Sequence, residues 1–194
     1  VDFNIHNIRK TMKSVSIYLF GSWAWLVFSV VFLVMVCCFP FTRTVASTRK
    51  LAKNCSTAII KLIGIELIVE GSENLVDEPS VLVANHASYT DPMILQAALP
   101  SHYAYVAKKE LKHIPFAVYV LGKMGTHLVD RRDAKEGAND FKKIMQSNKD
   151  KDSIIFFPEA TFLKERGLLK FKKGAFLTAI KNQVPIIPVT LNGT

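Results

Sequence analysis

A histidine and an aspartate stand five residues apart in the stretch "NHASYTDP", residues 85–92, directly after an apolar run at 81–84. A tight turn would let the Asp91 carboxylate accept the imidazole N–H of His86, which fixes the tautomer and leaves the other ring nitrogen as a base. The simpler alternative is a loop histidine beside a helix N-cap, because Thr90 or Asp91 followed by Pro92 is a favourable helix start. Both roles can coexist at Asp91.

A serine nucleophile is the other chemistry that this stretch could offer. Ser88 lies between the two residues but lacks the G-x-S-x-G turn that exposes such a nucleophile. We therefore expect Ser88 to be a structural hydroxyl, and we expect any acid–base chemistry to proceed without a covalent intermediate.

The elements around this stretch alternate between strand-like and helical segments from residue 65 onward. This alternation, with apolar strands, predicts an α/β domain with a largely parallel, buried sheet flanked by helices. In such sheets ligands bind at the carboxyl ends of the strands, where His86, Arg131 and Glu159 each follow a predicted strand. The expected strands lie in 65–71, 80–85, 102–107, 126–131, 153–158 and 184–191, and the expected helices in 91–98, 112–125, 134–148 and 172–183.

The amino-terminal part of the chain is strongly apolar. No charged residue occurs from Ser14 to Thr42, and as a helix residues 16–39 would reach about 36 Å, against a hydrocarbon core of roughly 30 Å. Basic residues flank both ends, so the orientation stays open and a helix that enters and leaves one leaflet is an alternative. We expect a membrane helix here.

Residues 44–63 predict an amphipathic helix with Arg49 on its basic side. It either packs on its own domain or lies along an anionic lipid surface. We therefore expect a membrane-anchoring helical region over 1–64 and an α/β domain over 65–194. Because the chain stops at "LNGT", just past a strand-like run, we expect the domain to be truncated at its carboxyl end.

Composition narrows the class of partner. The formal charge is +9 and 49% of the residues are hydrophobic, which indicates an anionic partner such as a nucleic acid, a lipid surface or a phosphorylated ligand. No nucleic-acid-binding motif is present, so we expect a lipid bilayer and no nucleic acid. The three cysteines lie in apolar or amphipathic segments, which favours reduced, packing cysteines over disulfides or a metal site.

Four blocks in order resemble the lysophosphatidic acid acyltransferase family, the glycerolipid acyltransferases with an H-x4-D motif. "NHASYTD" resembles the N-H-x-S-x-x-D block of that family, and "GKMGTHLVDR" (122–131) resembles G-x-x-F-[IV]-D-R, with Gly125 and Arg131 in register. "FFPEAT" (156–161) resembles F-P-E-G-T, and "VPIIPVTL" (184–191) resembles the last, proline-bearing block. The resemblance covers roughly residues 65–194.

The resemblance implies a membrane-associated enzyme with its catalytic domain on the cytoplasmic face. It would move a fatty acyl group from acyl-CoA or acyl carrier protein to the hydroxyl of a lysophospholipid, with 1-acyl-glycerol-3-phosphate as the expected acceptor. No metal and no cofactor beyond the acyl-donor co-substrate is implied. His86 would be the general base and Asp91 its orienting partner. The implied substrate-binding residues are Gly125, Arg131 on the acceptor's phosphate, Pro158, Glu159 on its polar head, and Thr161.

Two positions depart from the family pattern. Ala160 replaces a glycine and Phe162 replaces an arginine in the third block. Alanine tolerates positive φ less well than glycine, and Lys164 or Arg166 could supply the missing charge. Three alternatives therefore stay open: another lysolipid acceptor, hydrolysis of acyl thioesters, and a lipid-binding protein without turnover.

Overall fold

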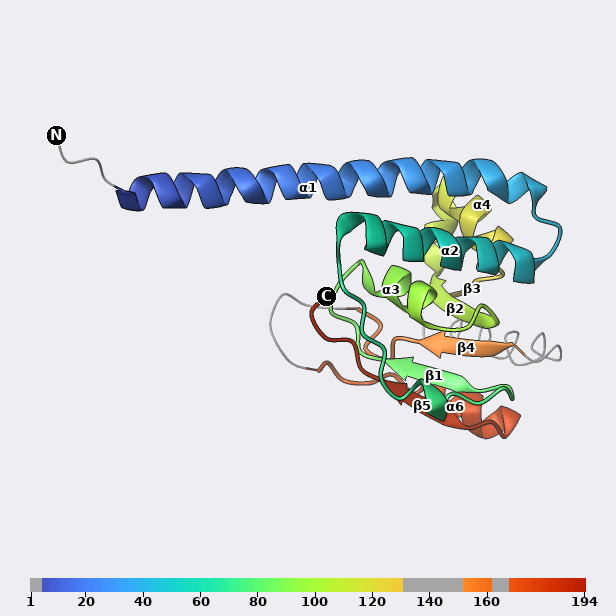
Figure 1. Cartoon of the computed structure of the whole chain (residues 1–194). Coiled ribbons are helices and arrows are strands. Elements are labelled where there is room, and N and C mark those ends of the chain that lie inside the picture. Colours follow the sequence, from blue (N-terminus) through green and yellow to red (C-terminus); the bar gives the residue numbers. More distant parts are fainter. Residues whose placement is uncertain (1–4, 131–151, 162–167) are drawn as a thin grey trace.

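The computed structural model describes residues 5–130, 152–161 and 168–194 of the chain. Its helices and strands alternate after an amino-terminal pair of helices (Figure 1). The helices are α1 (Ile5–Cys38), α2 (Val45–Ile63), α3 (Asp91–Ala98), α4 (Pro115–Lys123) and α6 (Gly174–Asn182), with short 3-10 turns η1 (Phe39–Phe41), η2 (Ser72–Asn74) and η3 (Lys109–His113). The strands are β1 (Val81–Ala84), β2 (Tyr103–Lys108), β3 (His127–Val129), β4 (Ser153–Phe156) and β5 (Ile186–Val189).

The strands form one sheet in the order β3-β2-β4-β1-β5, and every pairing between them is parallel. Leu82 of β1 lies opposite Ile155 of β4 on one side and Ile187 of β5 on the other. The predicted parallel α/β sheet is thus confirmed. Because all strands run the same way, the loops that leave β1 and β4, which are neighbours, meet at one edge.

Both faces of the sheet are buried, as side chains that alternate along each strand require. One face packs around α6, and the other packs around α3, on the opposite side of the sheet (Figure 1). The α6 face contains Val81, Val106, Val129, Ile154, Phe156, Ala175 and Ala179. The α3 face contains Leu82, Ala84, Leu95, Leu99, Tyr103, Ile155 and Phe157.

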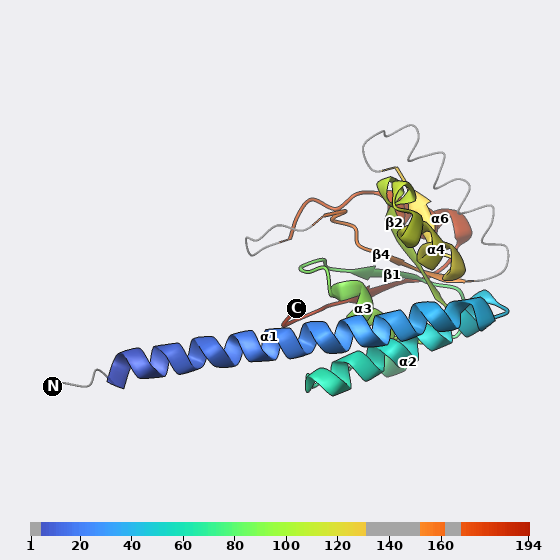
Figure 2. The same cartoon turned by 90° about the horizontal axis from the view of Figure 1, so that it is seen from above.

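Helices α1 and α2 form a hairpin above the α3 side of the sheet, and the amino-terminal half of α1 extends past the end of α2 (Figures 1 and 2). Thr44 and Ser47 form a reciprocal capping box that starts α2. Near the other end of α2, the indole N–H of Trp23 donates to the Leu62 carbonyl at 3.0 Å. The capping box thus stabilises the start of α2, and the Trp23 bond joins α1 to its end.

Length and composition make one helical stretch, Ser16–Phe41, a candidate membrane span. Its mean hydropathy is 2.5, and only 17% of its most apolar window is buried within the protein. Large side chains such as Leu19, Trp25 and Leu33 stand more than half exposed along it.

Arg49 of α2 is buried, with 3% of its surface exposed, although the helical pattern placed it on a solvated face. Its Nε donates to the Met124 carbonyl at 2.8 Å, and its Nη1 contacts the carboxylate of Asp152 at 2.9 Å and the His102 carbonyl at 3.1 Å. These three partners precede β3, β4 and β2, so Arg49 binds α2 to the amino-terminal edge of the sheet. The interpretation of α2 as a helix that packs on its own domain is therefore the one that the structure supports.

The strand expected at 65–71 is not formed. The segment has no strand assignment and no pairing within the described residues, and Ile65, Ile68 and Val69 are exposed. A β-propensity pattern alone does not make a strand, because a strand needs a hydrogen-bonded neighbour. The helix expected at 134–148 lies outside the described residues.

Candidate active site

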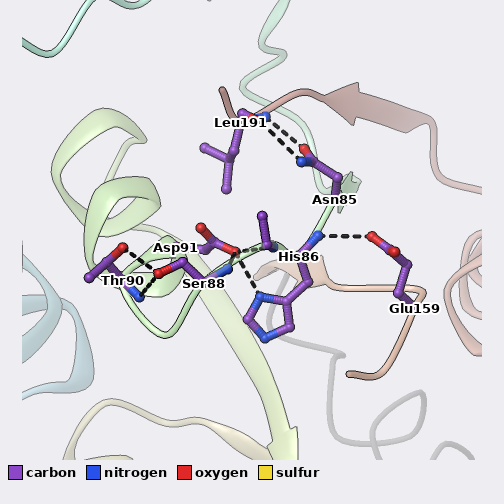
Figure 3. A network of polar contacts seen from close by, with 8 residues as sticks. Asn85, His86, Ser88, Thr90, Asp91, Glu159 and Leu191 are labelled. Carbon is purple, nitrogen blue, oxygen red and sulfur yellow. Dashed lines mark hydrogen bonds and ion pairs between the residues drawn. The ribbon is translucent and has the colours of Figure 1, made fainter. Parts of the chain in front are cut away.

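The loop between β1 and α3 brings His86 and Asp91 together (Figure 3). The Nδ1 atom of His86 lies 2.8 Å from Oδ2 of Asp91. The aspartate is fully buried, while 14% of the histidine side chain is exposed. The predicted contact between these two side chains is thus present, with the histidine on the accessible side.

The same Asp91 oxygen closes the loop. Oδ2 also accepts hydrogen bonds from the backbone N–H groups of Ala87 at 2.7 Å and Ser88 at 2.9 Å. Helix α3 does begin at Asp91, with Pro92 in its first turn, but neither Thr90 nor Asp91 caps it through a side chain in the expected manner. Thr90 is thus the N-cap residue by position, one of the two expected, whereas the Asp91 carboxylate turns back onto the preceding loop and does not cap the helix.

Ser88 is a structural hydroxyl, as expected. Its Oγ lies 2.9 Å from the Thr90 hydroxyl and accepts the Thr90 backbone N–H at 3.2 Å. These bonds tighten the turn on the side away from the histidine ring (Figure 3).

The hydrogen bonds to Asp91 determine its charge state. Burial alone would raise the pKa of Asp91, but hydrogen bonds from His86, Ser88, Thr194 and Ala87 outweigh burial and hold the pKa below the usual carboxyl range. An ionised carboxylate can only accept, so Nδ1 of His86 is the donor in this contact, and in a neutral ring the lone pair then belongs to Nε2. This is the tautomer that a general base requires.

The exit of β4 supplies the surroundings of the histidine. The ring of Phe157 stacks on the His86 ring, with centroids 4.3 Å apart and planes at 25°. Glu159, only 4% exposed, accepts the His86 backbone N–H through Oε1 at 2.9 Å and the Leu169 N–H through Oε2 at 2.8 Å. Glu159 is therefore a buried carboxylate with a backbone partner on each oxygen.

Residues 157–160 form a tight turn, since the Ala160 N–H donates to the Phe157 carbonyl at 3.0 Å. Ala160 adopts φ +63°, a conformation that glycine reaches far more readily. Pro158 is buried in this turn, and its carbonyl accepts the Lys172 N–H at 2.7 Å. Thr161, the next residue, is exposed. Alanine thus keeps the left-handed backbone at this position.

The structure does not bring Gly125 to the histidine. This residue precedes β3 at φ +64°, at the amino-terminal edge, and a Cβ there would lie 3.0 Å from Nη2 of Arg49 and from Cγ1 of Val45. The close packing against α2 explains why a glycine stands at position 125. Arg131 follows the end of β3 and lies outside the described residues, as do Phe162, Lys164 and Arg166.

Sequence reasoning missed two contributors to the site. Asn85 exchanges two hydrogen bonds with the backbone of Leu191, beyond β5, at 3.0 Å and 2.7 Å (Figure 3). Phe157 was read only as part of a strand. The signal for Asn85 was its place in the N-H-x-S-x-x-D block, whereas the stacking role of Phe157 has no sequence signal of its own.

A family model described as "Acyltransferase" matches residues 66–192. The chain belongs to the Acyltransferase family. That match contains the His86–Asp91 loop, the β4 exit and the five strands, so the site described above lies within the matched region.

Several curated members of the family are similar to this chain. The 1-acyl-sn-glycerol-3-phosphate acyltransferase of Saccharomyces cerevisiae is 35% identical over 144 residues, which are 72% of this chain and 48% of that protein. Proteins with the same name from Borreliella burgdorferi and Helicobacter pylori are 35% and 34% identical, over 56% and 63% of their lengths. The chain thus spans about half the length of the curated relatives it matches.

A solved structure shares the fold. The crystal structure of the 1-acyl-sn-glycerophosphate (LPA) acyltransferase PlsC from Thermotoga maritima matches 90% of this chain and 73% of its own, with a TM-score of 0.70 and 22% identity. This chain therefore shares its fold with that structure over most of its length.

Proposed function

We propose that this protein transfers a fatty acyl group from acyl-CoA or acyl carrier protein to the hydroxyl of 1-acyl-glycerol-3-phosphate, giving phosphatidic acid. The observation that carries the proposal is the 2.8 Å contact between His86 Nδ1 and a buried, ionised Asp91. The printed names of the relatives support the choice of acceptor.

The geometry supports direct acyl transfer from donor to acceptor, without an acyl-enzyme intermediate. Nε2 of His86 takes the proton from the acceptor hydroxyl, and the oxygen attacks the thioester carbonyl carbon. The resulting oxyanion collapses, the C–S bond breaks, and the leaving thiolate takes the proton back from the imidazolium. The negative charge of Asp91 stabilises the imidazolium between these steps, and general-base catalysis of this kind contributes ~10²–10⁴-fold.

The acceptor would lie across the carboxyl edge of the sheet. We propose that Arg131 binds its phosphate, since a guanidinium suits bidentate phosphate contacts. Arg131 follows β3, which is separated from β1 by β4 and β2, or about 14 Å at ordinary strand spacing. Pro158 and Thr161 belong to the turn between them, and Gly125 would act indirectly by setting the start of β3.

We also propose that residues 1–64 hold the catalytic domain on a bilayer. The exposed apolar side chains of α1 would face lipid, as their composition favours. We propose the cytoplasmic side for the domain on the family resemblance alone, because basic residues flank both ends of the helix and do not determine its orientation.

The test uses membranes that carry the whole chain, a labelled acyl donor and a panel of lysolipids. We expect label in the diacyl product of phosphorylated 1-acyl-glycerol, and His86→Ala should lose about 10²-fold or more in rate. His113→Ala, at an exposed histidine of η3, is the matched control. Release of free fatty acid alone would indicate a hydrolase, and efficient acylation of uncharged lysolipids would contradict the phosphate site.

A further inference from the structure

The carboxylate of Glu159 already has backbone partners on both of its oxygens. Oε1 accepts the His86 N–H at 2.9 Å and Oε2 accepts the Leu169 N–H at 2.8 Å. With 4% of its surface exposed, the residue has almost no area left for contact with a substrate. Its geometry therefore differs from that of a side chain that waits for a polar head group.

The two N–H donors come from different parts of the chain. His86 lies in the loop that leaves β1, and Leu169 lies in the segment that leads to α6. Glu159 itself lies in the turn that leaves β4, the neighbour of β1. One carboxylate thus joins three segments, two of which leave adjacent strands at the carboxyl edge.

Two carboxylates form hydrogen bonds with His86 from opposite sides (Figure 3). Asp91 binds the ring at Nδ1, and Glu159 binds the backbone N–H from the other side. Phe157, two residues before Glu159, stacks on the ring face. The β4 exit therefore fixes both the backbone and the ring plane of the base, while Asp91 fixes the ring's rotation.

Hydrogen bonds from N–H groups to a carboxylate are among the stronger ones in proteins. A buried carboxylate that loses them becomes costly, so the arrangement resists displacement. Displacement of a catalytic group by ~1 Å can cost on the order of 10²-fold in rate. The backbone contact at His86 is thus placed where small shifts matter.

We propose that Glu159 is a positioning residue for the general base His86, and that it does not bind the acceptor. The rate consequence rests on the acyl transfer proposed above, whereas the positioning itself does not. The acceptor head group is then left to the residues beyond the ends of β2 and β3.

Kinetics separate the two roles. Glu159→Gln keeps the size of the side chain but presents an NH₂ to one of the two N–H donors, and Glu159→Asp keeps the charge but withdraws the oxygens by one methylene. For a positioning residue we expect kcat to fall about 10–100-fold in both variants, with the KM values of acceptor and donor within about twofold of wild type. Glu78→Gln, at an exposed glutamate before β1, is the matched control. A raised acceptor KM with an unchanged kcat would overturn the proposal, and so would wild-type kcat in Glu159→Asp.

A second measurement does not need activity. Hydrogen–deuterium exchange on the whole chain in detergent should be faster in Glu159→Gln for peptides that cover 80–92 and 168–173, and unchanged in Glu78→Gln. Should Glu159→Gln fail to fold, Glu159→Asp supplies the same comparison. If wild type acylates no lysolipid yet exchange accelerates at both peptides, the proposed function fails and the positioning role stands. Unchanged exchange at 80–92 overturns the positioning role whatever the activity.

Discussion

The Asp91 carboxylate is fully buried and still ionised because a side chain and two backbone N–H groups converge on one of its oxygens. This single oxygen orients the His86 ring, closes the loop and places a negative charge beside the ring. The amide of an asparagine at this position has one uncharged acceptor oxygen, so its hydrogen bonds from these donors would be weaker than those of the carboxylate.

Asp91 should make the stability of the fold depend on pH. Since the folded state lowers its pKa, its contribution is complete above the ordinary carboxyl pKa of about 3.9 and is lost as pH falls through the lowered value. Asp91→Asn should cost on the order of 2 kcal/mol at pH 7, and its melting temperature should approach that of wild type as pH drops below about 4. Melting curves of both proteins from pH 7 to pH 3 measure the gap, and a gap that widens in acid would contradict this assignment.

Ala160 carries backbone strain that glycine would relieve. A left-handed backbone costs a non-glycine residue about 1–2 kcal/mol in the folded state. Glycine removes this cost, but its greater freedom in the unfolded chain offsets about 0.5–1 kcal/mol of the gain in stability. Ala160→Gly should therefore stabilise the protein by roughly 0.5–1 kcal/mol, measured by denaturant unfolding. Ala117→Gly, within α4, should instead destabilise it by about 1 kcal/mol. Equal signs for the two substitutions would refute the strain at Ala160.

At the scale of elements, α2 is part of the catalytic body as much as of the amino-terminal region. Besides Arg49, Lys53 donates from α2 to the Leu99 carbonyl at 2.7 Å, and Gln96 of α3 donates to the Arg49 carbonyl at 3.1 Å. Polar contacts therefore fix α2 to the domain, in addition to the apolar cluster that Ala52 and Cys55 form with Met35 of α1 and Phe39.

Arg49→Met should loosen the contact between α2 and the sheet. The substitution keeps much of the side-chain volume but leaves the Met124, His102 and Gly125 carbonyls without this donor. We therefore expect the free energy of unfolding to fall by an amount on the order of 3 kcal/mol. Arg49→Lys should recover little, because an ammonium cannot span the separated partners as a planar guanidinium does. Lys50→Met, at the exposed neighbouring position, serves as control. The melting temperature and the rate of proteolysis near Gly64 measure this loss of stability. Wild-type values in Arg49→Met would show that the Arg49 contacts do not hold α2 to the sheet.

The sequence predicted elements better than contacts between them. The strands β1 to β5 were found because apolar runs between turn residues suffice to indicate buried strands, and His86–Asp91 was found because its spacing fits one loop. Arg49 was placed on the wrong side of its helix and the backbone partners of Glu159 were missed, because a helical wheel or a motif shows which residue is charged, not which distant backbone group it meets. The prediction of a strand at 65–71 was wrong for the same reason, because strand pairing depends on a neighbouring strand that the local sequence does not specify.

At the scale of the whole molecule, the amino-terminal region has two separable parts. Trp23 is level with the end of α2 through its bond to Leu62, so residues before it extend beyond the body of the protein. The later part of the hairpin contributes buried core, including Phe39.

Two deletions should therefore behave differently. Removal of residues 1–22 should keep the fold and weaken retention on salt-washed membranes, because only the protruding part of α1 is lost. Removal of residues 1–64 should give aggregated protein, because it uncovers α3 and deletes Arg49. Sedimentation and size-exclusion profiles of both truncated proteins supply the comparison. A monodisperse, soluble product of the longer deletion would show that α2 is dispensable for the fold.

The sequence separation between Arg49 and its partners also determines the order in which the parts of the protein can assemble during synthesis. The carbonyl partner of Arg49 on Gly125 lies 76 residues further along the chain, and at roughly 5–20 residues per second the ribosome needs about 4–15 s to add that length. The apolar α1 is complete throughout this interval, whereas Arg49 gains the His102 carbonyl only 53 residues after its own synthesis and the Met124 and Gly125 carbonyls only at the end. During synthesis the apolar helix therefore has seconds in which to enter its own surroundings before the α/β domain is complete. The hairpin gains the last of these partners, Asp152, only when the nascent chain has reached the start of β4.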